Sequence, residues 1–225
     1  MAARGPIQPA PGAAGRRLVW NEGDAVESEL RQTAAKAALI VIDVQKAIDH
    51  PNWGRRNNPM AEANIARLLA AWREAGRTVI HVRHHSRLPN STYRAGQPGC
   101  EFKECAIPLP GELVVTKHAC NAFVGTDLER ILREGGHSVL VVAGVITNNS
   151  VEATVRMAGD LGFNTYLVSD AAFTFDRKAL DGTLHLAEDV HAHSLANLQG
   201  EYASVVETAD LLWVGGSLAN LTSTP

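Results

Sequence analysis

Three polar side chains each follow a hydrophobic segment of the chain, and together they could carry out a hydrolysis. Asp43 ends the segment ALIVID, Lys117 ends LVVTK, and Ser150 follows VLVVAGVITNN. A carboxylate can accept and return a proton, a lysine can orient that carboxylate and stabilise negative charge, and a hydroxyl can act as a nucleophile. A single charged residue after a strand is usually exposed to solvent, and an Asp–Lys pair at a strand end can have a purely structural role. The hypothesis of a hydrolytic site therefore depends on all three residues lying close together.

The segment Val139–Ala158 predicts how Ser150 is presented. It begins as an apolar, β-branched run that is typical of a buried parallel strand. A turn at Gly144 then leads through a polar cluster into a helix that we expect to begin near Asn149–Ser150. The free N–H groups at the start of a helix favour negative charge, as an oxyanion hole requires. The alternative interpretation is that Ser150 or Asn149 only caps the helix.

The rest of the chain alternates strands with helices. The expected strands are Ala38–Asp43, Thr78–Val82, Val114–Thr116, the strand that begins at Val139, and Thr165–Ser169. The expected helices are Ala61–Ala75, Thr126–Glu134, the helix after the turn, and Ala187–Glu201. This order predicts an α/β fold, a three-layer αβα sandwich with a mostly parallel, Rossmann-like sheet of about six strands. Because parallel strands share one carboxyl edge, Asp43, Lys117 and Ser150 should converge there.

The composition excludes several classes of function. With 225 residues, 45% of them hydrophobic, the chain can form one domain with a sizeable core. A net charge of −3 offers no electrostatic footprint for nucleic acid, and no apolar run approaches the roughly 20 residues of a membrane span. Three cysteines without paired spacing, and no apolar signal segment, favour the reducing cytoplasm. The three cysteines form no CxxC pair, and no metal site is expected.

The two ends of the chain differ in composition from its centre. Residues 1–33 are rich in Ala, Gly and Pro at first and are expected to form a flexible arm, and residues 215–225 a loose tail. The domain proper is expected at residues 34–214. The apolar residues at 18–20 could anchor the arm on a neighbouring subunit, which predicts a homo-oligomer, a dimer or a tetramer.

Three stretches in one order resemble a known family. The strand ending at Asp43, the stretch VTKHACNAF and the stretch GVITNNSVEATVRMAGDLGF, followed by YLVSDAAFTFD, are similar to the isochorismatase-like hydrolases, also called cysteine hydrolases. The resemblance covers about Ala37 to Leu212. It implies a cofactor-free hydrolase of a small amide, ureido or related C–N substrate. It also implies catalysis by Asp43, Lys117 and the residue at position 150.

The resemblance further implies a local backbone geometry at the turn. The backbone amides of Ile146 and Ser150 would form the oxyanion hole, and the peptide bond between Val145 and Ile146 would be cis. Such a bond costs roughly 3–4 kcal/mol and persists where its surroundings fix it.

The sequence departs from the family at the position of the nucleophile. Most amidase members carry cysteine where this chain has Ser150, and none of the cysteines at 100, 105 and 120 occupies that place. Ser150 is then an engineered isostere, a natural nucleophile deprotonated by Asp43, or a bystander while Asp43 acts directly on substrate or water. The last case is that of isochorismatase, so vinyl-ether hydrolysis is an alternative function. A catalytically silent binding protein is another.

Loops around the strand ends are expected to contact the substrate. Trp53 offers a flat apolar surface, here called the apolar plate, and the Arg55 guanidinium can bind a carboxylate through two hydrogen bonds. The equal alternative is that this loop is solvated or contacts another subunit. His191 and His193 are expected at the surface or at an interface. The predicted pocket residues are Gln45, Trp53, Arg55, His84, Phe123 and Asn149.

Overall fold

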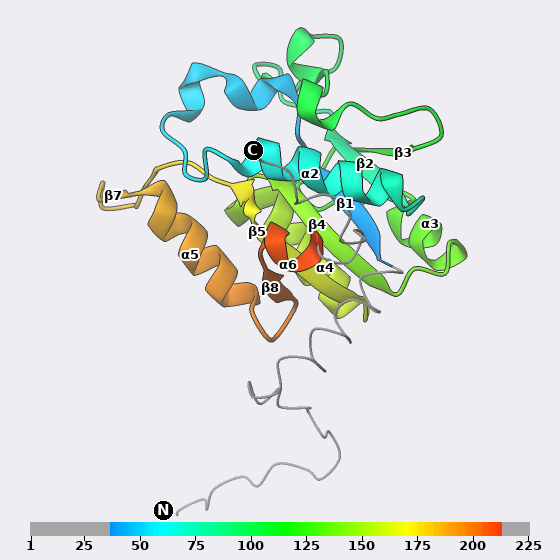
Figure 1. Ribbon diagram of the computed structural model, residues 1–225. Helices are drawn as coiled ribbons and strands as arrows, with labels where there is room; N and C mark the ends of the chain where they lie inside the picture. Colours follow the sequence, from blue (N-terminus) through cyan, green and yellow to red (C-terminus); the bar gives the residue numbers. More distant parts are fainter. Residues whose placement is uncertain (1–36, 213–225) are drawn as a thin grey trace, which may run out of the picture.

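A single parallel sheet organises the chain in the computed structural model, which describes residues 37–212 (Figure 1). Its strand order is β3-β2-β1-β4-β5-β8, and every neighbouring pair is parallel. The strands are β1 (Ala38–Ile42), β2 (Val79–His84), β3 (Leu113–Lys117), β4 (Val139–Val145), β5 (Asn164–Phe173) and β8 (Ser204–Val206). The predicted α/β fold with a six-stranded parallel sheet is confirmed. The expected arm, with its apolar residues 18–20, and the expected tail lie outside the described residues.

Helices cover both faces of the sheet. On one face α2 (Ala61–Glu74) and α6 (Thr208–Leu212) pack against a first core cluster. On the other face a second core cluster is completed by α3 (Leu128–Glu134), α4 (Glu152–Asp160) and α5 (Ala187–Leu198). The three layers of the prediction are therefore present.

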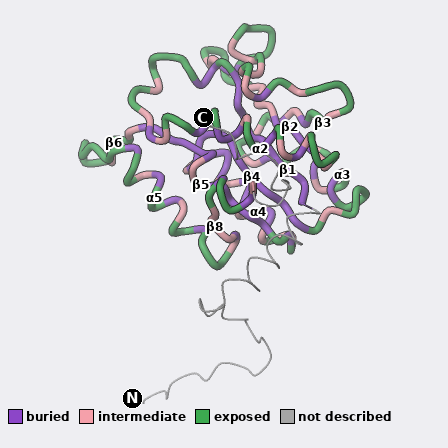
Figure 2. The backbone as a smooth tube through the Cα atoms, in the orientation of Figure 1, coloured by how far each residue is buried: buried purple, intermediate pink, exposed green. Residues whose placement is uncertain are grey.

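The two clusters follow from the alternation of side chains along the strands. All five residues of β1 are buried. Leu39 and Val41 face the first cluster, whereas Ala38, Ile40 and Ile42 face the second. Figure 2 shows the buried strands at the centre, with exposed loops around them. Burial on both faces explains why this segment reads as a continuous apolar run.

Helix α2 illustrates how the sequence defines its layer. Ile65, Leu68 and Trp72 recur at helical spacing on one side, and each is fully buried. The indole of Trp72 donates a hydrogen bond to the carbonyl oxygen of Ala37 at 2.9 Å, which ties the helix to the start of β1. Gly76, with a φ of 61°, ends the helix in the left-handed conformation that glycine adopts freely.

Several short elements were not expected from the sequence. They are the edge strand β8, helix α6, a hairpin of β6 (Arg177–Lys178) and β7 (Leu184–His185), and short 3-10 turns at Lys46–Asp49, Pro51–Trp53, Pro98–Cys100 and Glu104–Ala106. Helix α5 ends at Leu198 and not at Glu201, because Gln199 leaves helical geometry and Gly200 has a φ of 81°. The hairpin projects beyond the amino end of α5 (Figure 1).

Candidate active site

Asp43, Lys117 and Ser150 meet at the carboxyl edge of the sheet. Nζ of Lys117 lies 2.7 Å from Oδ2 of Asp43 and donates to Oγ of Ser150 at 3.2 Å. Its third donor reaches the carbonyl oxygen of Ala119 at 3.1 Å. An ammonium group has three N–H donors, so these contacts satisfy it completely. All three side chains of the cluster are buried, and Lys117 has no exposed surface at all.

The backbone places Asp43 through a close contact between β1 and β4. Ile42 lies in register with Gly144, and a Cβ atom on Gly144 would come within 2.2 Å of the carbonyl oxygen of Ile42. The φ of Gly144 is 128°, which only glycine adopts without strain. Directly after β1, Asp43 itself has a φ of 54°, a left-handed conformation that Asp tolerates better than most residues. The carboxylate therefore leaves the strand at a sharp, defined bend.

The turn after β4 holds Ser150 inside a helical segment. A π-helical turn runs from Thr147 to Val151 and leads directly into α4. The peptide bond between Val145 and Ile146 is cis, as the family resemblance implies. The hydroxyl of Thr154 donates to the carbonyl oxygen of Ser150 at 2.7 Å. Ser150 is not an N-cap, since it lies within the wound turn and not before it.

Behind this turn, the predicted surface position of His191 is wrong. Its imidazole is buried, and Nδ1 lies 2.9 Å from Oγ1 of Thr147. Nε2 lies 3.4 Å from the side-chain amide of Asn58. Burial lowers the pKa of His191, so the ring is neutral near pH 7 and supports the turn as a hydrogen-bonding partner. His193 is exposed, as expected.

The environment of Asp43 suits a group that holds and returns a proton. Burial raises the pKa of Asp43 above its ordinary value, against the lowering effects of the Lys117 ammonium and the Ser150 hydroxyl. Its Oδ2 faces Lys117, whereas Oδ1 is buried and has no hydrogen-bond partner within residues 37–212. A buried carboxylate oxygen without a donor is costly, and it is available to a proton or to a substrate.

His84 stands beside this cluster at the end of β2. It lies in register with Lys117, and its ring makes an edge contact with Tyr93 at 5.7 Å between centroids. Burial, together with the nearby positive charge of Lys117, lowers the pKa of His84 to about 4. Nδ1 of His84 is buried and unpartnered in the described part of the chain. A neutral imidazole with an open nitrogen can therefore contact a substrate.

An aromatic group covers the same edge of the sheet. Trp53 stacks on Phe175 at 5.5 Å between ring centroids and meets Tyr93 edge-on at 6.5 Å. The Tyr93 hydroxyl donates to the backbone oxygen of Asp43 at 3.3 Å. Val145 belongs to the same small core cluster as Tyr93 and Phe175, against which Trp53 packs. The predicted apolar plate thus adjoins the backbone of the site.

Three predicted pocket residues have other contacts. The Gln45 amide bonds the backbone of His84 in both directions, at 3.1 and 2.7 Å, and is fully buried. The Arg55 guanidinium pairs with Asp176 and with a second carboxylate at position 188, at 2.8 and 2.6 Å, so it is not free to bind a substrate. Phe123 packs against the second core cluster. Their polar or aromatic type did not reveal these partners.

Cys120 is the site residue that the sequence interpretation missed. Its Sγ lies 4.0 Å from Oγ of Ser150 and also contacts Oδ1 of Asn149, which places Asn149 at the mouth of the cluster. Cys120 is exposed, whereas Ser150 is buried. The signal in the sequence is the spacing, because Cys120 follows the strand-end Lys117 by only three residues.

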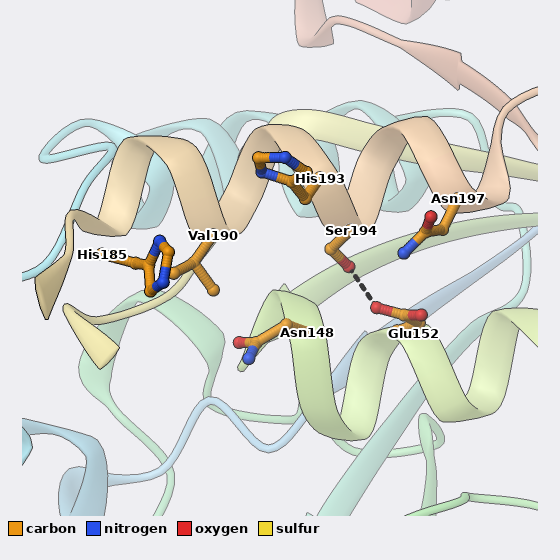
Figure 3. Close-up of a pocket in the computed structure, with 7 residues that line it drawn as sticks. All are labelled: Asn148, Glu152, His185, Val190, His193, Ser194 and Asn197. Atoms are coloured by element: carbon orange, nitrogen blue, oxygen red, sulfur yellow. Dashed lines mark hydrogen bonds between the residues drawn. The ribbon is translucent and has the colours of Figure 1, made fainter. Parts of the chain in front are cut away.

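A pocket of about 340 Å³ opens between α4 and α5, apart from the three clustered side chains (Figure 3). Its polar lining is partly paired, since the Ser194 hydroxyl donates to Glu152 at 2.6 Å. It is lined by Asn148, Glu152, His185, Val190, His193, Ser194 and Asn197.

Across the described residues, no group of three or more His, Cys, Asp or Glu side chains is arranged to hold a metal ion. Nor is any helix in that part of the chain long and apolar enough to cross a membrane.

Comparison with known proteins gives a consistent result. Residues 37–210 match the isochorismatase domain family. The isochorismatase family protein YrdC of Bacillus subtilis is 41% identical over 79% of this chain and 95% of its own length. A crystal structure assigned to that family, from Chromobacterium violaceum, is 54% identical with a TM-score of 0.78, covering 80% of this chain and 93% of the other. Maleamate amidohydrolase of Pseudomonas putida is 26% identical over 79% of this chain and 85% of its own length.

Proposed function

The chain belongs to the isochorismatase family of hydrolases, and from this premise we propose that it hydrolyses a C–N bond in a small amide or ureido compound. The observation that carries the proposal is the buried cluster of Asp43 and Lys117, 2.7 Å apart, beside the turn that holds Ser150. The similarity to maleamate amidohydrolase supports an amide as the bond that is cleaved.

In the proposed reaction Asp43 moves the proton. It accepts a proton from the attacking group and returns it to the leaving nitrogen, which a carboxylate with a raised pKa can do near neutral pH. Lys117 holds the carboxylate in place, and its charge stabilises the negative charge that develops. The backbone amides of Ile146 and Ser150 are proposed to bind the oxyanion. His84, neutral above about pH 4, would contact the substrate without adding charge.

Vinyl-ether hydrolysis on an isochorismate-like acid is the second candidate. It is favoured by the hydroxyl at position 150, since a serine is a far weaker nucleophile than a thiolate. In that reaction the open Oδ1 of Asp43 would act on substrate or water directly. A catalytically silent binding protein is the third candidate.

A substrate panel separates the three candidates. The purified chain is incubated with small amides including maleamate, with ureido acids and with isochorismate, and ammonia release and isochorismate loss are measured. We expect ammonia from at least one amide or ureido acid, and none from the Asp43→Asn variant. Isochorismate turnover without ammonia would replace the proposal with the second candidate. Ligand binding without turnover of any compound would replace it with the third.

We also propose that the chain acts in the cytoplasm as a homo-oligomer, a dimer or a tetramer. All three cysteines are free thiols, which suits a reducing compartment. The projecting hairpin and its junction with α5 expose Leu180, Leu184 and Leu186, an apolar surface that a second copy would cover. Light scattering at micromolar concentration should give at least twice the 24.1 kDa chain mass. A purely monomeric species would contradict this proposal.

A further inference from the structure

Ser150 is poorly placed to be the nucleophile itself. A hydroxyl oxygen has two lone pairs, and both face donors here, since Oγ receives bonds from Nζ of Lys117 at 3.2 Å and from Sγ of Cys120 at 4.0 Å. The side chain is also buried, with 8% of its surface exposed. A substrate carbon would have to displace one of these donors to reach the oxygen.

Cys120 has the properties that Ser150 lacks. Its residue is exposed, and its sulfur lies 4.0 Å from the Ser150 hydroxyl oxygen. The Asn149 side chain lies against the same sulfur, and turned over it would present its NH₂ group as a donor to a thiolate. Asp43 belongs to the same cluster; the residue is only 4% exposed, and its Oδ1 has no hydrogen-bond partner among residues 37–212. Ser150 therefore neighbours both groups, since its Oγ lies 4.0 Å from the Cys120 sulfur and its hydroxyl lowers the pKa of Asp43 as a hydrogen-bonding partner.

We infer that Cys120 is the covalent nucleophile of the proposed hydrolysis, and that Ser150 relays its proton to Asp43. The inference rests on the proposed function, but it assigns the nucleophile to a different element: the loop after β3 and not the turn after β4. The resting thiol is protonated, because partial burial raises its pKa against the lowering effects of Lys117 and of the bond to Ser150. It therefore needs the base that the relay supplies.

Acyl transfer to Cys120 begins with two coupled proton transfers. The Cys120 S–H proton passes to the Ser150 oxygen while the Ser150 proton passes to Asp43, and the sulfur forms a bond to the acyl carbon. The carbonyl electron pair moves to oxygen, then returns as the C–N bond breaks, and the leaving nitrogen takes the proton from Asp43. Water next attacks the thioester and gives a proton to Asp43. The C–S bond breaks, and the proton returns through Ser150 to the sulfur.

Acyl trapping tests this assignment without the natural substrate. The full chain is treated with p-nitrophenyl acetate, quenched in acid and mapped by peptide mass spectrometry. We expect the acetyl group on Cys120, formed about 100-fold faster than on Cys105, whose thiol packs against the first core cluster. In Ser150→Ala the acetylation of Cys120 should slow by about tenfold or more, because the relay is broken. The Cys105→Ala variant should keep the wild-type rate.

The outcomes are distinct from those of the substrate panel. Acetyl on Ser150, acetyl on neither residue, or an unchanged Cys120 rate in Ser150→Ala would each overturn the inference. On any amide that the wild type hydrolyses, Cys120→Ala and Cys120→Ser should both lose about 1,000-fold or more in kcat. Full turnover in Cys120→Ala would refute Cys120 as the nucleophile while leaving the amide hydrolysis intact. Absence of any turnover in the wild type would refute the proposed function alone.

Discussion

Lys117 reaches Asp43 across an intervening strand. Their contact is 2.7 Å from Nζ to Oδ2, although Lys117 ends β3, Asp43 follows β1, and β2 runs between these strands. Only a long side chain at the end of β3 can span that distance at the edge of the sheet. Lys117 is fully buried along its length, so its ammonium is held at one point.

We expect Asp43→Asn to lower kcat by about 1,000-fold, because an amide cannot accept and return the proton. Turnover of the amide identified by the panel gives the measurement. Circular dichroism should show an unchanged fold, since Asn retains the shape of Asp. Activity within threefold of the wild type would remove Asp43 from the mechanism.

Lys117→Met should destabilise the chain by about 3–5 kcal/mol near pH 8, since it leaves the Asp43 carboxylate buried and unpaired. The loss should shrink towards about pH 4, where Asp is protonated in the unfolded chain. The pKa of Asp43 is raised in the folded state, so the folded chain keeps this proton to a higher pH than the unfolded chain does. Stability therefore falls as the pH rises through this range. Urea unfolding at pH 5 and pH 8 measures the difference.

The double variant Asp43→Asn with Lys117→Met is the control for that experiment. It removes both charges, so it should recover stability relative to Lys117→Met alone at pH 8. Equal stability of the single and double variants would mean that the lost contact is packing and not charge.

The stability of the wild type should fall between pH 6.5 and pH 4 partly through His84. Its pKa in the folded state is about 4, so in this range the unfolded chain binds more protons and stability rises with pH. The full shift corresponds to about 3 kcal/mol, which solvent screening at this half-buried ring reduces to about 1 kcal/mol. In His84→Gln the pH dependence measured by urea unfolding should flatten by that amount. An unchanged slope would locate the titration in other groups.

Gly144→Ala should cost about 3 kcal/mol or more, because the new Cβ collides with the backbone of Ile42 in a conformation that only glycine adopts easily. Gly182→Ala is the matched control. Gly182 also has a positive φ, 89°, but no neighbouring atom of the described residues lies within 4 Å of a Cβ placed there. Thermal or urea unfolding of both variants separates the collision from the backbone strain. Equal losses would show that the contact between β1 and β4 contributes nothing.

Much of the fold could be predicted because its strands are buried on both faces. The apolar run ending at Asp43 and the run from Val139 mark two central strands, and the strand ends then define the site. Strand β8 escaped prediction because it is three half-buried residues long, too short for a pattern to appear. Its position in the sheet depends on pairing with β5, a contact between distant parts of the chain.

The contacts of the pocket residues could not be predicted for the same reason. Arg55 meets Asp176 and Glu188 only when the loop after β1 folds against the start of α5. Gln45 was predicted to line the substrate pocket, yet tertiary structure buries it fully against the backbone of β2. Cys120 stands only three residues after Lys117 in the sequence, but its contact with Ser150 depends on how the loop after β3 folds against the turn after β4.

The order of the strands determines when the folding chain becomes catalytically active. Asp43, Lys117 and Ser150 come from the ends of three strands that are separated in the chain by complete crossovers. Parallel pairing between distant segments forms slowly, because the chain loses the entropy of loop closure before the stabilising contacts between the strands can form. No fragment lacking any one of these strands can hold the cluster. Recovery of turnover after dilution from denaturant should therefore lag behind recovery of helical signal, and it reports the completion of the central sheet.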